Sequence, residues 1–183
     1  MVDKDAELEK LFGSCVVTGE ASVDDNGLVS CTGDVRLAQD LHMLPVKFHH
    51  VAGYFDCSNN ALLTSLQGSP KTVGKWFNCS IVPELKSLEG APETVGIDFD
   101  CSYNASLESL KGLGRVNGGL NITYQRTLPL LRCLQAKYVT FDPILPNHPV
   151  ERILNKYAGK GRREMFWCQK ELEDAGFEEN ARW

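Results

Sequence analysis

Residues 51–112 carry a pattern of apolar and polar positions that repeats every 22 residues. Each repeat contains a Phe-x-Cys motif, then a Leu-x-x-Leu motif and a glycine. The aligned positions are Phe55, Phe77 and Phe99; Cys57, Cys79 and Cys101; Leu63, Leu85 and Leu107; Leu66, Leu88 and Leu110; and Gly68, Gly90 and Gly112. A period of this length is typical of a solenoid, in which each repeat packs only against its neighbours.

Each repeat predicts one short strand and one return segment. The Phe-x-Cys motif alternates with period two, as expected of a strand with one buried face. The Leu-x-x-Leu motif predicts a packed return segment, and the glycine and proline that follow turn the chain back. A 22-residue coil leaves no room for a long helix. We therefore expect parallel strands on one side of the stack and extended or 3₁₀ segments on the other.

The repeat continues more weakly in both directions. Upstream, the apolar positions are filled by Val29, Val35, Leu41 and Leu44. Downstream, after the loss of one residue, they are filled by Val116, Leu120, Ile122, Leu128 and Leu131, and Val139 and Phe141 predict a last, truncated strand. We expect about five to six coils, three of them clear.

Both ends of the stack need caps, because a terminal coil exposes apolar surface. Residues 5–12 place leucines at helical spacing and predict a short helix, and residues 16–35 predict a hairpin around an Asp-Asp-Asn-Gly turn. At the other end, residues 150–157 and 162–175 each present one apolar helical face, and Gly176 is a fitting C-terminal cap. These helices are expected to cover the last coil.

The predicted fold class is an α/β repeat solenoid with short parallel strands. We divide it into an N-terminal helix and hairpin cap over residues 1–28, a solenoid over residues 29–142, and a C-terminal helical cap over residues 143–183.

The repeat motif Phe-x-Cys-Ser-x-Asn, followed by Leu-x-Ser-Leu-x-Gly-x-Pro, resembles the leucine-rich repeat, L-x-x-L-x-L-x-x-N/C-x-L. Phe55 and Cys57 would occupy two strand leucines, and Asn60 would occupy the asparagine. Two departures leave the turn geometry open. The asparagine column is interrupted by Val82, and each coil has one residue inserted before the first leucine of its Leu-x-x-Leu motif.

The repeat sequence, with Cys-Ser-Asn-Asn followed by Gly-Ser-Pro or Gly-Ala-Pro, is similar to that of repeat proteins of tailed bacteriophages. The similarity covers residues 29–141. The resemblance implies a leucine-rich-repeat solenoid. By analogy alone it also implies a phage accessory protein that inhibits a host defence or metabolic factor in the host cytoplasm.

The charge and composition of the chain disfavour nucleic-acid binding and a membrane-spanning segment. The formal net charge of -5 disfavours binding to a nucleic-acid backbone and permits a basic protein partner. No stretch approaches the roughly 20 apolar residues of a membrane span. Seven cysteines without a secretory signal favour a cytoplasmic protein with reduced thiols.

The sequence shows no clear catalytic, metal or cofactor site, so we expect none and favour a binding protein over an enzyme. The cysteine column occupies buried strand positions, where thiols behave as small hydrophobes. His49 and His50 have no ligand partner at useful spacing. A basic cluster between the last two helices, with Lys156, Lys160, Arg162 and Arg163, is a solvated junction or a small anion-binding patch.

The strand face is the better candidate site, because residues flanking Phe and Cys point away from the core. The candidate partner-binding residues are Tyr54, Asp56, Trp76, Asn78, Asp98, Asp100, Tyr103 and Tyr124. Aromatic residues are enriched at binding hot spots. The alternative is that these rings pack on one another and have no partner.

Two function classes follow from this face. The first is a protein-interaction module that binds a partner through a concave strand face, anchored by aromatics and steered by aspartates. The second is a binder of a small nucleotide-like ligand, with aromatics stacking a base and the basic cluster meeting phosphate. The oligomeric state stays open.

Overall fold

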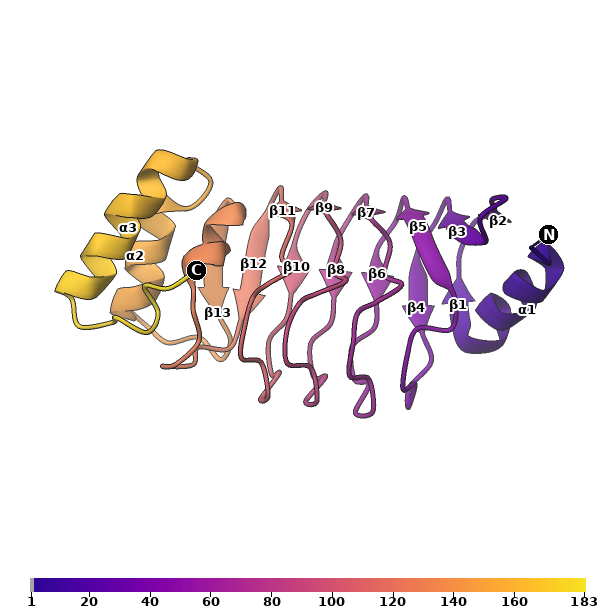
Figure 1. Cartoon of the computed structure of the whole chain (residues 1–183), viewed down its shortest axis with the longest axis horizontal. Coiled ribbons are helices and arrows are strands. Elements are labelled where there is room, and N and C mark those ends of the chain that lie inside the picture. The colour runs from indigo at the N-terminus through magenta and orange to yellow at the C-terminus, as the bar shows by residue number, and fades with distance from the viewer. Residues whose placement is uncertain (1) are drawn as a thin grey trace.

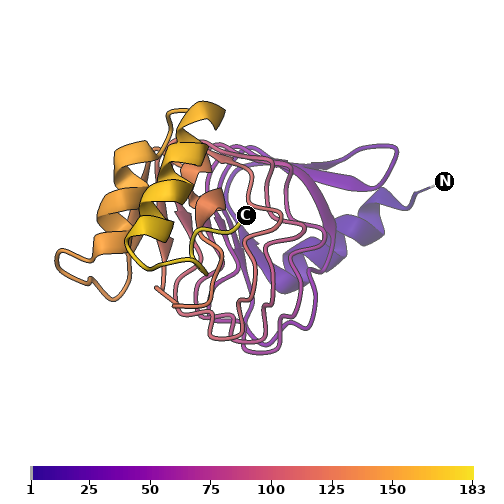
Figure 2. The same cartoon turned by 60° about the vertical axis from the view of Figure 1, so that its left-hand side comes forward.

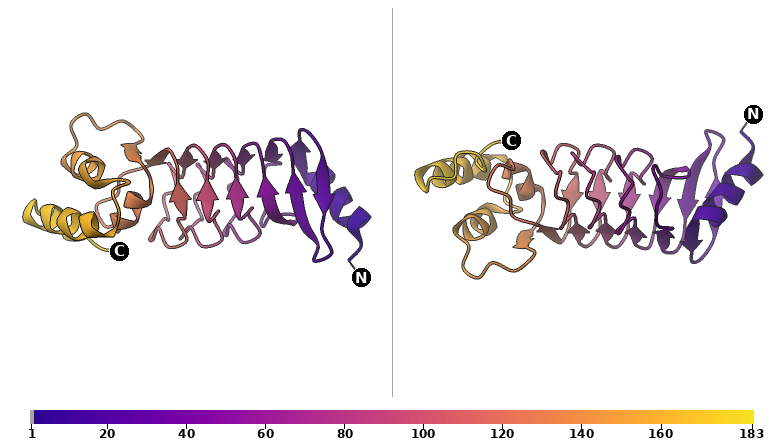
Figure 3. Two further views of the ribbon diagram at one scale, coloured as in Figure 1. Left: turned by 90° about the horizontal axis from the view of Figure 1, so that it is seen from above. Right: turned by 90° about the horizontal axis from the view of Figure 1, so that it is seen from below.

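The computed structural model describes residues 2–183 and shows a solenoid of about five turns between one N-terminal and two C-terminal helices (Figure 1). Figure 2 shows the coils following one another with a similar outline, and Figure 3 shows their strands in a nearly straight row. This architecture confirms the predicted parallel-strand solenoid with helical ends.

Two sheets run along the stack. The seven-stranded sheet, here called sheet A, consists of β1 (Cys15–Val17), β4 (Val35–Leu37), β6 (Phe55–Asp56), β8 (Phe77–Asn78), β10 (Phe99–Asp100), β12 (Gly119–Ile122) and β13 (Tyr138–Phe141). The six-stranded sheet, here called sheet B, consists of β2 (Ala21–Val23), β3 (Leu28–Cys31), β5 (Lys47–Val51), β7 (Thr72–Val73), β9 (Thr94–Val95) and β11 (Arg115–Val116).

The register of sheet A follows the 22-residue repeat. Phe55 lies opposite Phe77, Phe77 opposite Phe99, and Phe99 opposite Leu120, all in parallel pairs. The rings of Phe55 and Phe77 stack with centroids 5.6 Å apart, and those of Phe77 and Phe99 are 4.9 Å apart. The alignment found in the sequence is therefore the physical stacking order of the core.

The Leu-x-x-Leu return segments lie between turns and outside both sheets, in keeping with the expectation of extended or 3₁₀ segments. The sequence did not predict sheet B, which forms after the glycine of each coil and in which Val51, Val73, Val95 and Val116 are buried and pair in register. The Thr-Val dipeptides of β7 and β9 explain this, because β-branched residues suit a half-buried strand. Each coil is thus held by backbone ladders on two sides.

The cysteine column lies in the core, as predicted. Cys57 and Cys79 are completely buried, Cys101 is nearly so, and Cys133 continues the buried set. Desolvation by burial raises the pKa of all four thiols well above the usual value. These side chains therefore remain protonated packing groups at neutral pH.

The conserved spacing of glycine in the repeat has a steric cause. Gly68, Gly90 and Gly112 have φ values of 100°, 92° and 98°, where side chains are disfavoured. A Cβ at Gly112 would also lie 2.1 Å from the Leu88 carbonyl oxygen. This turn can be closed only by glycine.

The N-terminal end is covered by α1 (Lys4–Ser14) and by the antiparallel hairpin of β2 and β3, as predicted. The Asp24 carboxylate accepts hydrogen bonds from the Asn26 and Leu28 amides and shapes the hairpin turn. β1 pairs antiparallel with β4 and begins sheet A.

At the C-terminal end, the short 3₁₀ helix η1 (Leu131–Gln135) precedes β13, and α2 (Pro149–Tyr157) and α3 (Arg162–Asp174) follow it. α2 closes the free edge of β13 with side chains. The Asn155 amide accepts from the Val139 N–H and donates to the Val139 carbonyl, both at 2.7 Å. Glu151 accepts from the Phe141 N–H at 2.9 Å.

A buried asparagine reinforces several coils. Asn60 and Asn104 form hydrogen bonds with backbone groups of their own and neighbouring coils. In the last full coil, Asn180 from the C-terminal segment donates to the Gln125 and Leu128 carbonyls. The chain end therefore completes a coil that the repeat itself leaves without an asparagine.

No helix within residues 2–183 has the length and apolar character needed to cross a membrane.

Candidate functional site

The outer face of sheet A presents three rows of side chains, because neighbouring strands are in register and alternate side chains point outward. We call this surface the sheet A face. Its first row is Asp34, Tyr54, Trp76, Asp98, Gly119 and Tyr138; its second is Arg36, Asp56, Asn78, Asp100, Asn121 and Thr140; its third is Ser58, Ser80, Ser102, Thr123 and Asp142.

The first row contains a stacked aromatic pair. The rings of Tyr54 and Trp76 lie 4.1 Å apart between centroids and 7° from parallel, and both side chains are half-buried. The Arg36 guanidinium lies 6.0 Å from the centre of the Tyr54 ring. The structure thus brings together two of the four predicted aromatic residues, next to Asp98 in the same row.

The other two predicted aromatic residues lie elsewhere. Tyr103 occupies the turn after β10 with a φ of 58°, and its hydroxyl donates to the Asp142 carboxylate at 2.6 Å. Tyr124 packs against Phe141 and His148, and its hydroxyl donates to the Asn180 side chain. Tyr124 is therefore part of the C-terminal cap rather than of a continuous aromatic row.

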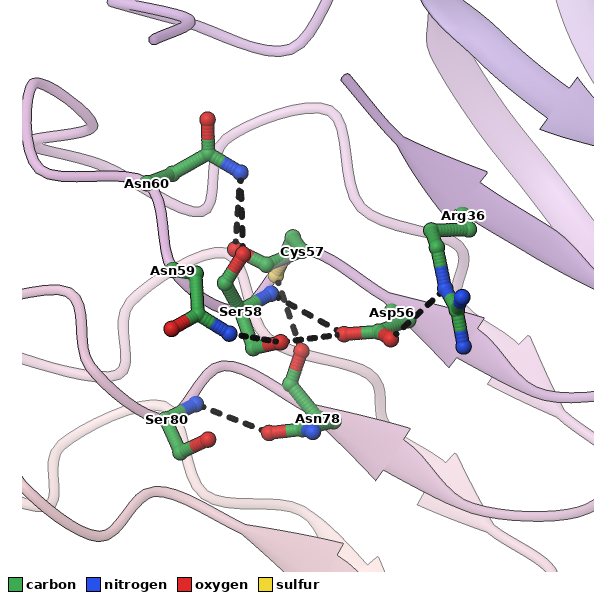
Figure 4. A network of polar contacts seen from close by, with 8 residues as sticks. All are labelled: Arg36, Asp56, Cys57, Ser58, Asn59, Asn60, Asn78 and Ser80. Carbon is green, nitrogen blue, oxygen red and sulfur yellow. Dashed lines mark hydrogen bonds and ion pairs between the residues drawn. The ribbon is translucent and has the colours of Figure 1, made fainter. Parts of the chain in front are cut away.

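The second row is held by side-chain contacts to the third. Asp56 accepts from the Ser58 amide and hydroxyl, and Asn78 accepts from the Ser80 amide (Figure 4). Asp100 repeats the Asp56 arrangement with Ser102, at 2.9 and 2.7 Å. One oxygen of each of these side chains therefore fixes the strand end.

Asp56 is less available than predicted. The residue is only 8% exposed, and its second carboxylate oxygen lies 3.1 Å from Nε of Arg36 (Figure 4). Asp34, at the same end of the face, pairs with Lys75 at 3.4 Å. The negative charges of this end are therefore compensated within the chain.

The charges at the other end are not compensated in this way. Among the described residues, Asp98, Asp100 and Asp142 form no ion pair, and their partners are neutral donors. Asn121 donates to Asp100 at 3.2 Å and to Asp142 at 3.5 Å. The sheet A face thus changes from neutralised to acidic along the stack.

Tyr138 is a residue of this region that sequence reasoning missed. Its hydroxyl donates to Asp98 at 3.2 Å, and the negative charge of Asp98 raises the pKa of Tyr138. The ring reaches Asp98 across Gly119, where an added Cβ would lie 2.3 Å from the ring. The sequence did offer one signal, because Gly119 is the only position without a side chain in a row otherwise filled by large or charged residues.

These side chains surround a hollow of about 440 Å³ between β10, β12 and β13. Its lining includes Asp98, Asp100, Asn121, Tyr138, Thr140, Asp142 and Ile144. No lysine, arginine or histidine among the described residues lines it.

The other candidate groups are remote from the sheet A face. His50 contacts Thr72 on sheet B at 2.6 Å. Lys156 pairs with Glu171 between α2 and α3, at the far end of the molecule from the Tyr54 and Trp76 strands (Figure 1). The basic cluster and the aromatic pair are therefore not brought together.

Comparison of the chain with protein-family models, with curated proteins and with solved structures finds no match.

Proposed function

We propose that this chain is a protein-interaction module whose partner binds across the sheet A face. The observation that carries the proposal is the juxtaposition, on one face, of a stacked aromatic pair with Asp98 and Asp100, which form no ion pair with any described residue. Leucine-rich-repeat membership stays part of this proposal, supported by the buried asparagines at Asn60 and Asn104.

The aromatic pair supplies an anchor. Tyr54 and Trp76 immediately precede the adjacent strands β6 and β8 near the middle of sheet A and are only half-buried by the chain itself. Stacking holds both rings in one orientation, so little side-chain entropy is lost when a partner covers them. Rigid, partly exposed tryptophan and tyrosine side chains are typical of binding hot spots.

The carboxylates supply selectivity. Asp98 and Asp100 extend from the aromatic pair toward the C-terminal end of the face, and the whole chain carries a net charge of -5. A partner with a basic surface would be steered toward this end, and the attraction would weaken with salt. This charge pattern favours a protein partner over a nucleotide, whose phosphates the same carboxylates would repel.

The phage resemblance extends the proposal to the partner's source. For a phage-encoded chain, the partner would be a host protein in the host cytoplasm, and the binding would inhibit it. The observation behind this extension is the repeat sequence, in which Cys-Ser-Asn-Asn is followed by Gly-Ser-Pro.

Affinity capture with matched baits tests the proposal. The wild-type chain, Trp76→Ala and Phe166→Ala are immobilised and incubated with lysate of the source cells, and bound proteins are quantified by mass spectrometry. Phe166 is a matched control, because it is exposed and contacts another ring, Trp167, but lies on α3. A protein held in stoichiometric amount by wild type and Phe166→Ala, but lost with Trp76→Ala, would support the proposal. A partner retained by Trp76→Ala would exclude the sheet A face.

A further inference from the structure

The hollow at the C-terminal end of the sheet A face combines apolar walls with acidic groups. The Tyr138 ring and Ile144 form apolar walls, and Ile144 is 76% exposed. Asp98, Asp100 and Asp142 come from the first, second and third rows, so their charges surround the space from different sides. Such a lining complements a group that has an apolar stem and a cationic end.

The carboxylates of this hollow are not neutralised by basic side chains among the described residues, unlike those at the other end of the face. At the N-terminal end of the same face, Arg36 and Lys75 neutralise Asp56 and Asp34. The carboxylates of the hollow have only neutral donors among the described residues. The Asn121 Oδ1 atom is buried and accepts no hydrogen bond there, so one polar atom at the hollow is also unsatisfied.

A metal ion is a poor match for this arrangement. Within the described part of the chain, no three His, Cys, Asp or Glu side chains gather closely enough to hold one. Separated carboxylates suit a planar cation with several donors, because different N–H groups can meet different oxygens. A guanidinium can also stack on the Tyr138 ring, which a strongly hydrated ammonium does less well.

We propose that this hollow receives the guanidinium end of an arginine side chain presented by the protein partner. This inference rests on the proposed function and names the chemistry of the partner at one end of the same face. The aromatic pair would anchor the partner in the middle of the sheet, and the arginine would fix its direction along the stack.

The hollow can be tested without the partner. The ¹⁵N-labelled full chain is titrated with Nα-acetyl-arginine N-methylamide and followed by NMR. We expect saturable shifts of the Gly119 backbone amide, which donates to Asp98, and of the Asn121 side-chain amide. A single side chain should bind with a Kd on the order of millimolar. The corresponding norleucine derivative has the stem without the charge and should cause no such shifts.

Variants separate the site from general acidity. Asp98→Asn with Asp100→Asn removes both charges, keeps one acceptor oxygen in each side chain and should weaken binding about tenfold or more. Thr140→Arg places a guanidinium at the hollow from within the chain and should block the probe while leaving the carboxylates. Glu93→Gln, beside sheet B, removes one exposed charge and should change nothing.

The corresponding lysine derivative is titrated as a second control, because it carries an ammonium in place of the guanidinium. Shifts spread over the whole acidic surface, equal binding of the norleucine or lysine derivative, or full binding by the double variant would overturn the arginine site. Failure of the proposed function would look different. If the Trp76→Ala bait still captures the partner, the sheet A face is not the binding surface. If Trp76→Ala loses the partner but the Asp98→Asn, Asp100→Asn bait retains it fully, only the arginine site is refuted.

Discussion

The indole of Trp76 lies flat on the phenol of Tyr54, 4.1 Å away across neighbouring coils. The alternative that the sequence left open, in which the rings pack on one another, is thus partly true of the free chain. Stacking covers only one side of each ring, and both residues stay half-buried. The pair is therefore a rigid, partly exposed apolar step on a face that is otherwise polar.

We expect Trp76→Ala to weaken partner binding by about thirtyfold or more, since truncating a central aromatic costs roughly 2 kcal/mol or more. The loss of unfolding free energy should be smaller, about 1 kcal/mol, because the side chain lies outside the core. Titration calorimetry with the captured partner and urea denaturation measure the two effects. Equal affinity for Trp76→Ala and the Phe166→Ala control would contradict the prediction.

Substitutions at Cys79 should show that the thiol column is packing. The side chain is completely buried. Cys79→Ala is expected to lower the unfolding free energy by about 1 to 2 kcal/mol through the space left behind. Cys79→Asp should prevent folding, because an unpaired buried carboxylate costs several kcal/mol against a typical stability of about 5 to 15 kcal/mol. Circular dichroism during heating measures both, and a cooperative, parent-like transition in Cys79→Asp would refute the strand register.

The same thiols should make the fold sensitive to alkali. Burial raises the pKa of Cys57, Cys79, Cys101 and Cys133 in the folded chain, whereas unfolded thiols ionise near pH 8.5. Their contribution to stability is therefore complete below about pH 8.5 and is lost as the pH rises toward the folded pKa. Each thiol costs about 1.4 kcal/mol per pH unit in that window.

Together the four thiols should lower the unfolding free energy by about 5 kcal/mol between pH 9 and pH 10. Urea denaturation at several pH values measures the slope. Burial also raises the pKa of Cys15, Cys31 and Cys168, so Cys79→Ala, the matched control, should reduce the measured slope by about a seventh. An unfolding free energy that does not change up to pH 10 would show that the thiols are accessible to water.

The backbone at Ile81 should be strained, and a suitable substitution should relieve that strain. It lies in the turn after β8 with a φ of 55°, a conformation that disfavours β-branched residues, and its side chain is 45% exposed. Asn59 occupies the equivalent turn with a φ of 57°. Ile81→Asn should therefore stabilise the chain by about 1 kcal/mol. Ile97→Asn replaces a similarly exposed isoleucine and should give no gain, and equal melting shifts in the two variants would count against strain.

Asn155 should protect the end of sheet A. Asn155→Ala removes both hydrogen bonds to Val139 and leaves the backbone of that residue unpaired at the strand edge. We expect a loss of about 1 to 3 kcal/mol in unfolding free energy and concentration-dependent association, because open edges pair with other chains. Urea denaturation and light scattering measure these effects. Arg152→Ala, on the exposed side of the same helix, should behave as wild type.

The sequence predicted sheet A because Phe55, Phe77 and Phe99 carry a strong period at core positions. It did not predict sheet B, because each repeat strand there buries a single side chain, such as Val73, whereas each Phe-x-Cys motif buries two. The caps were visible from helical spacing, but the side-chain bonds that close β13 were not, because Asn155 lies far along the chain from any repeat signal.

The candidate face was predictable only where the repeat is regular. Tyr54, Trp76, Asp98 and Asp100 lie on it as the register requires. Tyr124 follows a one-residue deletion and turns to the cap, where His148 and Asn180 hold it. The contact of Tyr138 with Asp98 joins residues 40 positions apart and depends on the empty space above Gly119.

The return of Asn180 to the last full coil links folding to the order of synthesis. Earlier coils can stack as soon as each leaves the ribosome, since they need only their neighbours. The Gln125 and Leu128 carbonyls and the Leu130 amide must wait for residue 180. A nascent chain that has reached only α3 therefore lacks the hydrogen-bond partners of this coil, and the coil is completed when residues 180–182 are made.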